Sequence, residues 1–187
     1  MNTLAIKALR IGATALVFAF ISFTASAATS SNASPFGLEI GVASCDVARA
    51  KLGRVIESKL DGNDVLLTAA APSALYDGAS KAIVRCIDGK VIAVQIEASK
   101  GGMGNDGARE VYSNLSKKYK LVAGGPMPNL GNGYARYDAG NSVVEQDAPH
   151  LSFEFTLTYY EKSFYSSIVT SKKEKERRAK EKKQSSL

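Results

Sequence analysis

Residues 35–53 of this chain read PFGLEIGVASCDVARAKLG. Apolar residues alternate with glycine and glutamate from Phe36 to Gly41, which predicts a short strand with one buried face. Ser44 is a residue type that accepts a hydrogen bond from a free amide of the first helical turn, and Asp46 suits the positive end of a helix dipole. Gly53 can take the left-handed conformation that often ends a helix. We therefore expect a strand followed by a helix of two to three turns.

The first 27 residues have the three parts of a secretory signal peptide. Lys7 and Arg10 form a positive region, residues 11–23 are mostly apolar, and Ala25-Ser26-Ala27 fits a small-x-small cleavage site. Cleavage leaves a mature chain of 160 residues, enough for one domain with a real core. No second long apolar segment follows, so we expect no transmembrane insertion after cleavage. An uncleaved membrane anchor is the alternative.

Charge is distributed unevenly along the chain. Residues 171–187 hold eight basic and three acidic residues, whereas residues 28–170 hold 14 basic and 15 acidic ones. The basic isoelectric point therefore describes a C-terminal tail and not a basic binding face on the domain. Nucleic acid is not an expected partner of an exported domain that is close to neutral.

The chain has two cysteines, Cys45 and Cys86. In an exported protein such a pair raises the possibility of a disulfide, which would stabilise the fold by roughly 4 kcal/mol in the chain-entropy model. Cys86 shares a predicted strand face with Ala82 and Val84, so it should point inward. Sequence alone does not bring the two cysteines within reach of one another, so two separate buried thiols remain the alternative.

After a small, polar leader at residues 28–34, the first half of the chain alternates apolar runs with turn residues. Asp88-Gly89 lies between two apolar runs and favours a type I′ turn, so its flanking strands should pair antiparallel. The strands that we expect in this half, after the first helix, are residues 55–58, 65–70, 75–76, 82–87 and 91–98.

The second half has the same order of elements. Residues 106–119 carry apolar side chains on one helical stripe, and a glycine- and proline-rich connection follows at residues 123–133. Strands are then expected at residues 134–138, 142–146 and 151–159. In the last of these, Leu151, Phe153, Phe155, Leu157 and Tyr159 alternate with polar residues, which is typical of an antiparallel strand with one wet face.

The predicted fold class is therefore α+β, an antiparallel sheet with helices packed on one face. Two helix-plus-meander units would be a diverged repeat, although their residues show no self-match. A single domain is expected over residues 35–170. The basic tail, residues 171–187, is expected to be helical or disordered, with helical spacing for the pairs Glu174–Arg178 and Glu176–Lys180.

Several segments resemble a family of exported bacterial envelope proteins of uncharacterised activity. They are the run FGLEIG at residues 36–41 leading into the first helix, LxxKYK at residues 115–120, and APHLSFxFTLTY at residues 148–159 ahead of a basic C-terminus. The resemblance implies an envelope location and no particular reaction. Residues 41–53 are also similar to the opening of the small outer-membrane assembly lipoproteins of the SmpA/OmlA type. This chain has no cysteine directly after its predicted cleavage site, so lipidation there is not expected.

Motifs that could carry chemistry are weak in this sequence. Residues 102–107 read GMGNDG and fit the G-x-G-x-x-G pattern, but the strand before them is half of a hairpin and residues 111–137 contain no carboxylate to bind a ribose. His150 is the only histidine and has no expected catalytic partner. Asp61, Asn63 and Asp64 form a broken calcium-loop pattern that is better explained as a turn. We predict no catalytic residue, no cofactor and no metal.

The sequence favours a non-enzymatic binding module for an envelope component, in the periplasm or secreted. Inhibition of a secreted enzyme, with the loop at residues 124–133 as the contact, is one alternative; a small hydrolase is the other. The exposed aromatics and basic side chains expected to touch a partner, by protein contact or by charge toward an anionic surface, are Tyr160, Phe164, Tyr165, Lys172, Lys173, Arg177 and Arg178.

Overall fold

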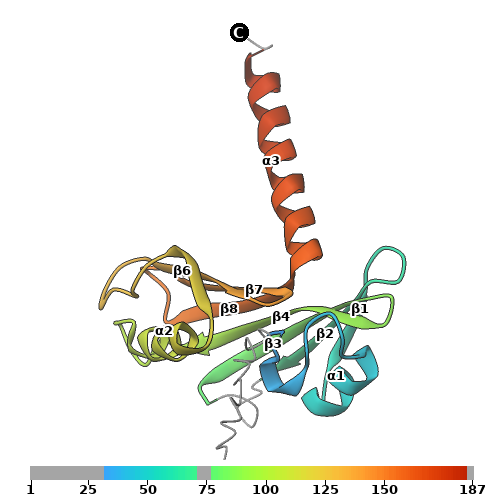
Figure 1. Cartoon of the computed structure of the whole chain (residues 1–187), viewed down its shortest axis with the longest axis horizontal. Helices are drawn as coiled ribbons and strands as arrows, with labels where there is room; N and C mark the ends of the chain where they lie inside the picture. Colours follow the sequence, from blue (N-terminus) through green and yellow to red (C-terminus); the bar gives the residue numbers. More distant parts are fainter. Residues whose placement is uncertain (1–31, 71–76, 185–187) are drawn as a thin grey trace, which may run out of the picture.

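The structure, a computed structural model, describes residues 32–70 and 77–184. These residues form one eight-stranded antiparallel sheet with three α-helices (Figure 1). The predicted signal peptide, the strand expected at residues 75–76 and residues 185–187 lie outside the described ranges. The strands are β1 (Ile56–Lys59), β2 (Val65–Ala70), β3 (Ala79–Ile87), β4 (Lys90–Ser99), β5 (Lys120–Gly124), β6 (Gly133–Ala139), β7 (Ser142–Ala148) and β8 (Glu154–Glu161).

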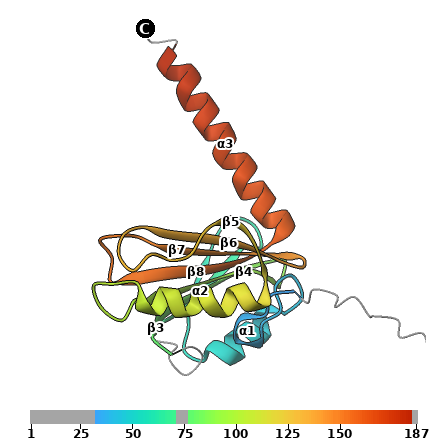
Figure 2. The same cartoon turned by 60° about the vertical axis from the view of Figure 1, so that its left-hand side comes forward.

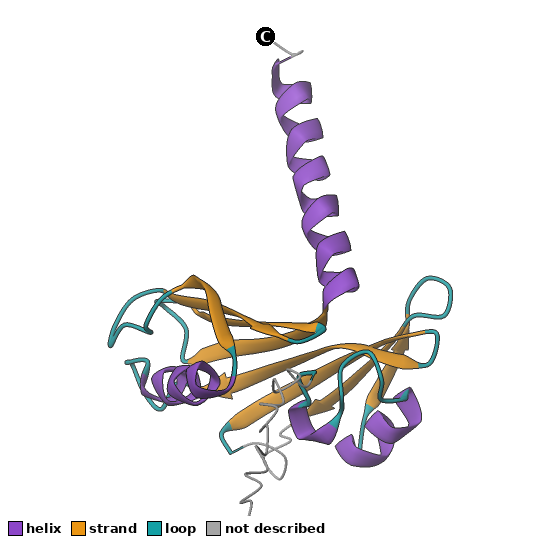
Figure 3. Cartoon of the chain, viewed as in Figure 1, coloured by secondary structure: helices purple, strands orange, loops and turns teal. Residues whose placement is uncertain are grey.

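The order of strands in the sheet shows that the fold consists of two similar units. The order is β1-β2-β3-β4-β8-β7-β6-β5, so each unit is a four-stranded meander and the two meanders meet where β4 pairs with β8. One helix precedes each meander, α1 (Cys45–Leu52) before β1 and α2 (Asp106–Lys118) before β5. Both helices pack on the same face of the sheet (Figure 3). The predicted α+β architecture of two helix-plus-meander units is confirmed.

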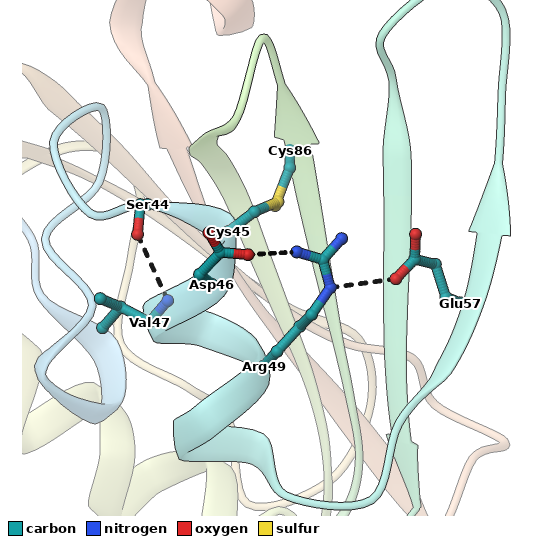
Figure 4. The surroundings of a disulfide bond; sticks show 7 residues. All are labelled: Ser44, Cys45, Asp46, Val47, Arg49, Glu57 and Cys86. Carbon is teal, nitrogen blue, oxygen red and sulfur yellow. Dashed lines mark hydrogen bonds and ion pairs between the residues drawn. A yellow bond between two sulfur atoms is a disulfide. The ribbon is translucent and has the colours of Figure 1, made fainter.

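The ends of α1 follow the local signals in its sequence. Ser44 Oγ accepts a hydrogen bond from the amide of Val47 at 3.3 Å, and Gly53 ends the helix with φ 72°. Cys45, in the first turn, forms a disulfide with Cys86 in β3, with 6.0 Å between the Cα atoms (Figure 4). The disulfide therefore links α1 to the sheet, and the alternative of two separate thiols is wrong.

The segment before α1 does not form the expected strand. It folds into a short 3₁₀ turn, η1 (Pro35–Gly37), in which Phe36 has a positive φ of 55°. The amide of Ile40 donates to Ala33 O at 3.0 Å, so most of this backbone bonds locally. It reaches the sheet only at its end, where the amide of Gly41 donates to Val91 O at 2.8 Å and Ser44 forms an isolated bridge with Lys90. Leu38 and Ile40 are nevertheless buried. The alternation predicted the buried side chains correctly and the secondary structure wrongly.

The hairpin between β3 and β4 matches its prediction. Asp88 and Gly89 have φ values of 49° and 75°, which is the type I′ geometry that Asp-Gly favours. By contrast, β5 lies where a glycine- and proline-rich connection was expected to begin. It is an edge strand with side chains that are mostly exposed, so its sequence shows no apolar alternation.

The last strand begins later than its alternation predicts. β8 starts at Glu154, because the chain turns at Pro149, where the amide of Ser152 donates to Pro149 O at 3.3 Å. Leu151 and Phe153, which would continue the buried stripe, are instead 93% and 68% exposed. Phe155, Leu157 and Tyr159 do face the core, as expected.

The core lies between the sheet and the two helices α1 and α2. A buried glutamine joins the sheet to α2, because Gln146 Nε2 in β7 donates to the carbonyl of Ala108 at 2.6 Å. The large side chains that are fully buried include Leu67, Val84, Val94, Ile96, Tyr137, Val144 and Phe155.

A third helix, α3 (Lys162–Gln184), follows β8 without a break. It leaves the sheet on the face opposite to α1 and α2 and projects away from it (Figure 2). None of its residues is buried. At 1.5 Å per residue it is about 34 Å long.

Candidate functional site

The first turn of α3 is attached to the open face of the sheet, and we call this attachment the helix root. Its centre is Tyr165. The Tyr165 hydroxyl donates to Glu145 Oε1 in β7 at 2.8 Å and accepts from Arg136 in β6 at 2.9 Å. Tyr134 donates to the same Glu145 oxygen at 2.6 Å. Strands β6 and β7 and the helix α3 therefore meet around one carboxylate.

Aromatic and charged contacts surround this centre. The rings of Tyr165 and Tyr160 pack with their centroids 5.5 Å apart, and the Arg85 guanidinium lies 4.9 Å above the ring of Phe164. Such a cation–π contact contributes about 0.5–1 kcal/mol at an exposed site. Tyr160, Phe164 and Tyr165, which we expected to be exposed contact residues, are half-buried here and hold α3 to the sheet.

Both tyrosines that bond Glu145 are proton donors at neutral pH. Burial, followed by the hydrogen bond to the Glu145 carboxylate, raises the pKa of Tyr134 and the pKa of Tyr165 above the ordinary value of tyrosine. Arg136 opposes the rise at Tyr165, because its positive charge favours the phenolate. A stable hydrogen-bonded centre of this kind has a structural role in placing α3.

Glu161, directly before α3, caps the N-terminus of this helix. Its Oε2 accepts from the amide of Phe164 at 2.9 Å and from the hydroxyl of Ser163. Burial acts to raise the pKa of Glu161, but hydrogen bonds from the Ser163 hydroxyl and the amides of Phe164 and Ser163 lower it below the usual value of 4.5. The ionised form therefore stabilises the start of α3.

Beyond its root, α3 is a basic helix with two chemically different sides. On one side Glu174 binds Arg177 at 2.7 Å and Arg178 at 2.9 Å, and Glu181 also binds Arg177. The pair Glu174–Arg178 is thus confirmed. In total α3 carries nine basic and three acidic residues.

The other side of α3 is formed by lysines. At about 100° per residue, Lys172, Lys173 and Lys180 fall within about 100° of one another, opposite to Glu174 and Glu181. We call these three residues the lysine face. No carboxylate of the described residues lies within 4.0 Å of their ammonium groups. The expected Glu176–Lys180 pair is absent within the same limit, although Glu176 lies on this side. The lysine face, with Glu176 among its three lysines, therefore keeps a net positive charge, whereas Arg177 and Arg178 are paired.

An open groove of about 500 Å³ lies between Arg85 of β3 and the first half of α3. Arg85 and Phe164 form its inner end, and Lys172 and Lys175 form its outer end. The groove is wide and shallow, so it suits an extended or flat partner better than an enclosed small molecule.

The glycine motif at residues 102–107 allows α2 to pack closely on the sheet. It follows β4, which pairs antiparallel with both β3 and β8, so it does not follow the parallel strand of a dinucleotide site. Gly107 opens α2 directly against the end of β4, and a Cβ atom there would lie 2.6 Å from Ser99 O. Close approach of helix and strand explains this glycine.

The other candidates for chemistry lie apart. His150 is exposed in the loop before β8, where its backbone amide donates to Asn132 Oδ1 at 2.8 Å. Asp64 binds Arg85, and Asn63 donates to Asp88 at 2.9 Å, so residues 61–64 form a turn tied to neighbouring strands. Within residues 32–70 and 77–184, no three His, Cys, Asp or Glu side chains are grouped as metal ligands would be. No helix in those ranges is long and apolar enough to cross a membrane.

Comparison with known proteins adds no relationship: no family model, no curated protein and no solved structure matches the chain. The resemblance to exported envelope proteins therefore stays a prediction.

Sequence reasoning missed the partners of the helix root. Arg85, Arg136 and Glu145 alternate outward on their strands, and this pattern shows only that they face away from the core. Their meeting depends on the pairing register across five strands, from β3 to β6, which no local signal contains.

Proposed function

We propose that this protein is a non-enzymatic binding module of the bacterial envelope, and that α3 is its contact to an anionic envelope component. The observation that carries the proposal is the lysine face on a helix that projects from the sheet without a buried residue. A helix of this length that stabilised only its own fold would bury an apolar stripe. Its lysine face instead lies about 15–27 Å along the helix from its start, away from a nearly neutral domain.

The helix root supports this role, because a projecting helix holds its basic side chains in a defined position only if its first turn is attached firmly to the sheet. Tyr165, Phe164 and Lys162 all bind strands of the open face, the last through an ion pair with Asp138 at 2.7 Å. The root fixes where α3 leaves the sheet, and the outer turns of the helix project beyond it (Figure 2).

An extracytoplasmic location is part of the proposal. The disulfide Cys45–Cys86 is typical of proteins that fold in an oxidising compartment. Together with the predicted signal peptide and the absence of a predicted lipidation site, it favours a periplasmic or secreted protein. Anionic lipid headgroups and acidic envelope polymers are the components that lysines would meet there.

Co-sedimentation with isolated envelope fractions tests the proposal. The mature protein, a form lacking residues 171–187, and the variant Lys172→Gln/Lys173→Gln/Lys180→Gln would be compared at low and high salt. A matched control, Lys59→Gln/Lys90→Gln/Lys117→Gln, changes the net charge equally on exposed parts of the domain. Vesicles containing phosphatidylglycerol serve as a defined anionic surface.

We expect binding at low salt that the lysine-face variant weakens by on the order of tenfold or more, since each lysine near an anionic surface contributes about 1 kcal/mol. The control should bind almost as well as the unchanged protein, and high salt should release both. Equal losses in the two variants would mean that only net charge matters. Binding that survives the removal of residues 171–187 would assign the contact to the domain instead.

A further inference from the structure

A second exposed surface lies at the end of the sheet opposite to α3. Four large apolar side chains project from three neighbouring loops, and we call them the apolar tip: Met103, Leu130, Leu151 and Phe153. They are 84%, 66%, 93% and 68% exposed, respectively. Single exposed apolar side chains are common, but a group of them on adjacent loops marks an interaction site.

The loops that carry the apolar tip are tied together by buried polar residues. Lys100, 1% exposed, donates its side-chain ammonium to Pro149 O, and its backbone amide donates to Phe153 O at 2.9 Å. Asn105, 2% exposed, donates its side-chain amide to Pro128 O and Gly131 O, both at 3.0 Å. The loop after β4 is therefore fixed to the loop before β8 and to the loop before β6.

In these loops a lysine is buried and large apolar side chains are exposed, which is the reverse of the usual distribution. Burying a lysine is unfavourable, and desolvation lowers the pKa of Lys100 accordingly. The same loops leave Leu151 and Phe153 in water, although their alternation with Phe155 would let them continue the buried stripe of β8. The buried Lys100 and Asn105 hold the loops in place, and the loops expose the apolar tip. Such a fixed, exposed apolar group is expected of a preorganised contact surface.

The charges around the apolar tip favour one class of partner. Asp106, Asp147 and Glu154 flank the three loops. Arg109 offsets Asp106, at 3.6 Å, and the Lys100 ammonium offsets part of the charge of Asp147, whereas no ion pair among the described residues involves Glu154, so the border stays net negative. An anionic membrane would be repelled by this border. A second copy related by a two-fold axis would bring two acidic borders together.

We propose that the apolar tip docks into an apolar cleft, bordered by basic side chains, on a different folded protein. Convex loops with projecting Leu and Phe side chains complement a concave surface, and the acidic border complements the basic rim. This contact is separate from the proposed role of α3. β8 spans roughly 26 Å between the two surfaces at 3.3 Å per residue, so both could be occupied at once.

Site-specific photo-crosslinking followed by reconstitution tests the inference. In cells that make the full chain, a benzophenone side chain would replace Met103 or Leu130, and, as exposed apolar controls outside the three tip loops, Val42 or Ile56. A protein captured from both tip positions and from neither control would be identified and purified. Its dissociation constant would then be measured for the unchanged chain, for Leu151→Ser/Phe153→Ser, and for the matched control Val42→Ser/Ile56→Ser.

The expected result is one partner whose dissociation constant rises by on the order of 30-fold for the tip variant, with little change for the control variant. Binding should persist at high salt and in the absence of residues 171–187, which separates this contact from that of α3. Capture of lipid, capture of a second copy of the chain, capture of no protein, or a purified partner that binds the tip variant equally well would each overturn the inference. Because the substituted side chains are exposed, equal thermal midpoints are expected for all variants.

Discussion

The hydroxyl of Tyr165, in the first turn of α3, donates to the carboxylate of Glu145 in β7 at 2.8 Å. This bond is one of the contacts that hold a helix with no buried residue at a defined place on the sheet, together with those of Phe164 and Lys162. The carboxylate is shared with Tyr134, which belongs to the sheet alone. The two tyrosines can therefore be separated by mutation, because only one of them connects the helix.

The variant Tyr165→Phe should loosen the helix root without unfolding the domain. A hydrogen bond to a carboxylate contributes about 1.5–3 kcal/mol when buried, and the half-exposed site reduces this to about 1 kcal/mol. We expect amide hydrogen exchange in the first turns of α3 to become about fivefold faster, measured by NMR or mass spectrometry. Tyr134→Phe is the matched control, since it removes a bond to the same carboxylate and should leave exchange in α3 unchanged. Equal acceleration in both variants would show that the carboxylate network acts as one unit.

The start of α3 should depend on pH through Glu161. Because hydrogen bonds lower the pKa of this carboxyl in the folded protein, its stabilising effect is complete above the unfolded value near 4.5 and is lost as the pH falls through the lower folded value. The amide resonance of Phe164 should therefore shift, and its protection decrease, as the solution is acidified below about pH 4.5.

Glu161→Gln should abolish that transition, because the amide side chain does not titrate in this range. Glu176→Gln, at an exposed position farther along α3, should retain it. Persistence of the transition in Glu161→Gln would assign it to another carboxyl.

Reduction of the disulfide should destabilise the whole domain. Cys45 and Cys86 are 41 residues apart, so the cross-link stabilises by about 4 kcal/mol in the chain-entropy model. Urea unfolding with and without reductant should show a loss of about 2–5 kcal/mol. Cys45→Ala/Cys86→Ala should show the same loss and no further response to reductant. A response of less than about 1 kcal/mol would mean that packing of α1 on β4 holds this helix unaided.

Sequence patterns predicted the elements whose determinants are local. The caps of α1 at Ser44 and Gly53 and the turn at Asp88-Gly89 each depend on two or three neighbouring residues. The strand β5 was missed because an edge strand with exposed side chains has no apolar period. The start of β8 was misplaced because alternation continues through Leu151 and Phe153, whereas the turn at Pro149 interrupts the ladder.

The two surfaces with proposed functions were predictable only in part. The charge of the tail is visible in the sequence, and the spacing of Glu174 and Arg178 predicted one of the ion pairs, although Arg177 is neutralised as well. The apolar tip was not recognised, because its loops lie far apart in the chain and meet through Lys100 and Asn105. Buried polar residues that join loops have no sequence period, so only the three-dimensional structure identifies them.

Gly107 offers a test of how closely α2 approaches the sheet, because two effects of an alanine oppose one another there. In an ordinary helix position, replacing glycine by alanine stabilises by about 1 kcal/mol. Here the new Cβ atom would lie 2.6 Å from the backbone oxygen of Ser99 and 3.3 Å from the carbonyl carbon of Lys100. Backbone atoms cannot move aside as a flexible side chain can, and such overpacking costs about 1–3 kcal/mol.

We therefore expect Gly107→Ala to lower the free energy of unfolding by up to about 2 kcal/mol, measured by urea denaturation. Gly125→Ala is the matched control, because a Cβ atom at Gly125 meets nothing within 4 Å; it should be neutral or slightly stabilising. Since Gly107 follows the loop that is tied by Lys100 and Asn105, a displaced α2 should also disturb the apolar tip. A Gly107→Ala protein more stable than the unchanged chain would show that the start of α2 lies farther from β4 than described here.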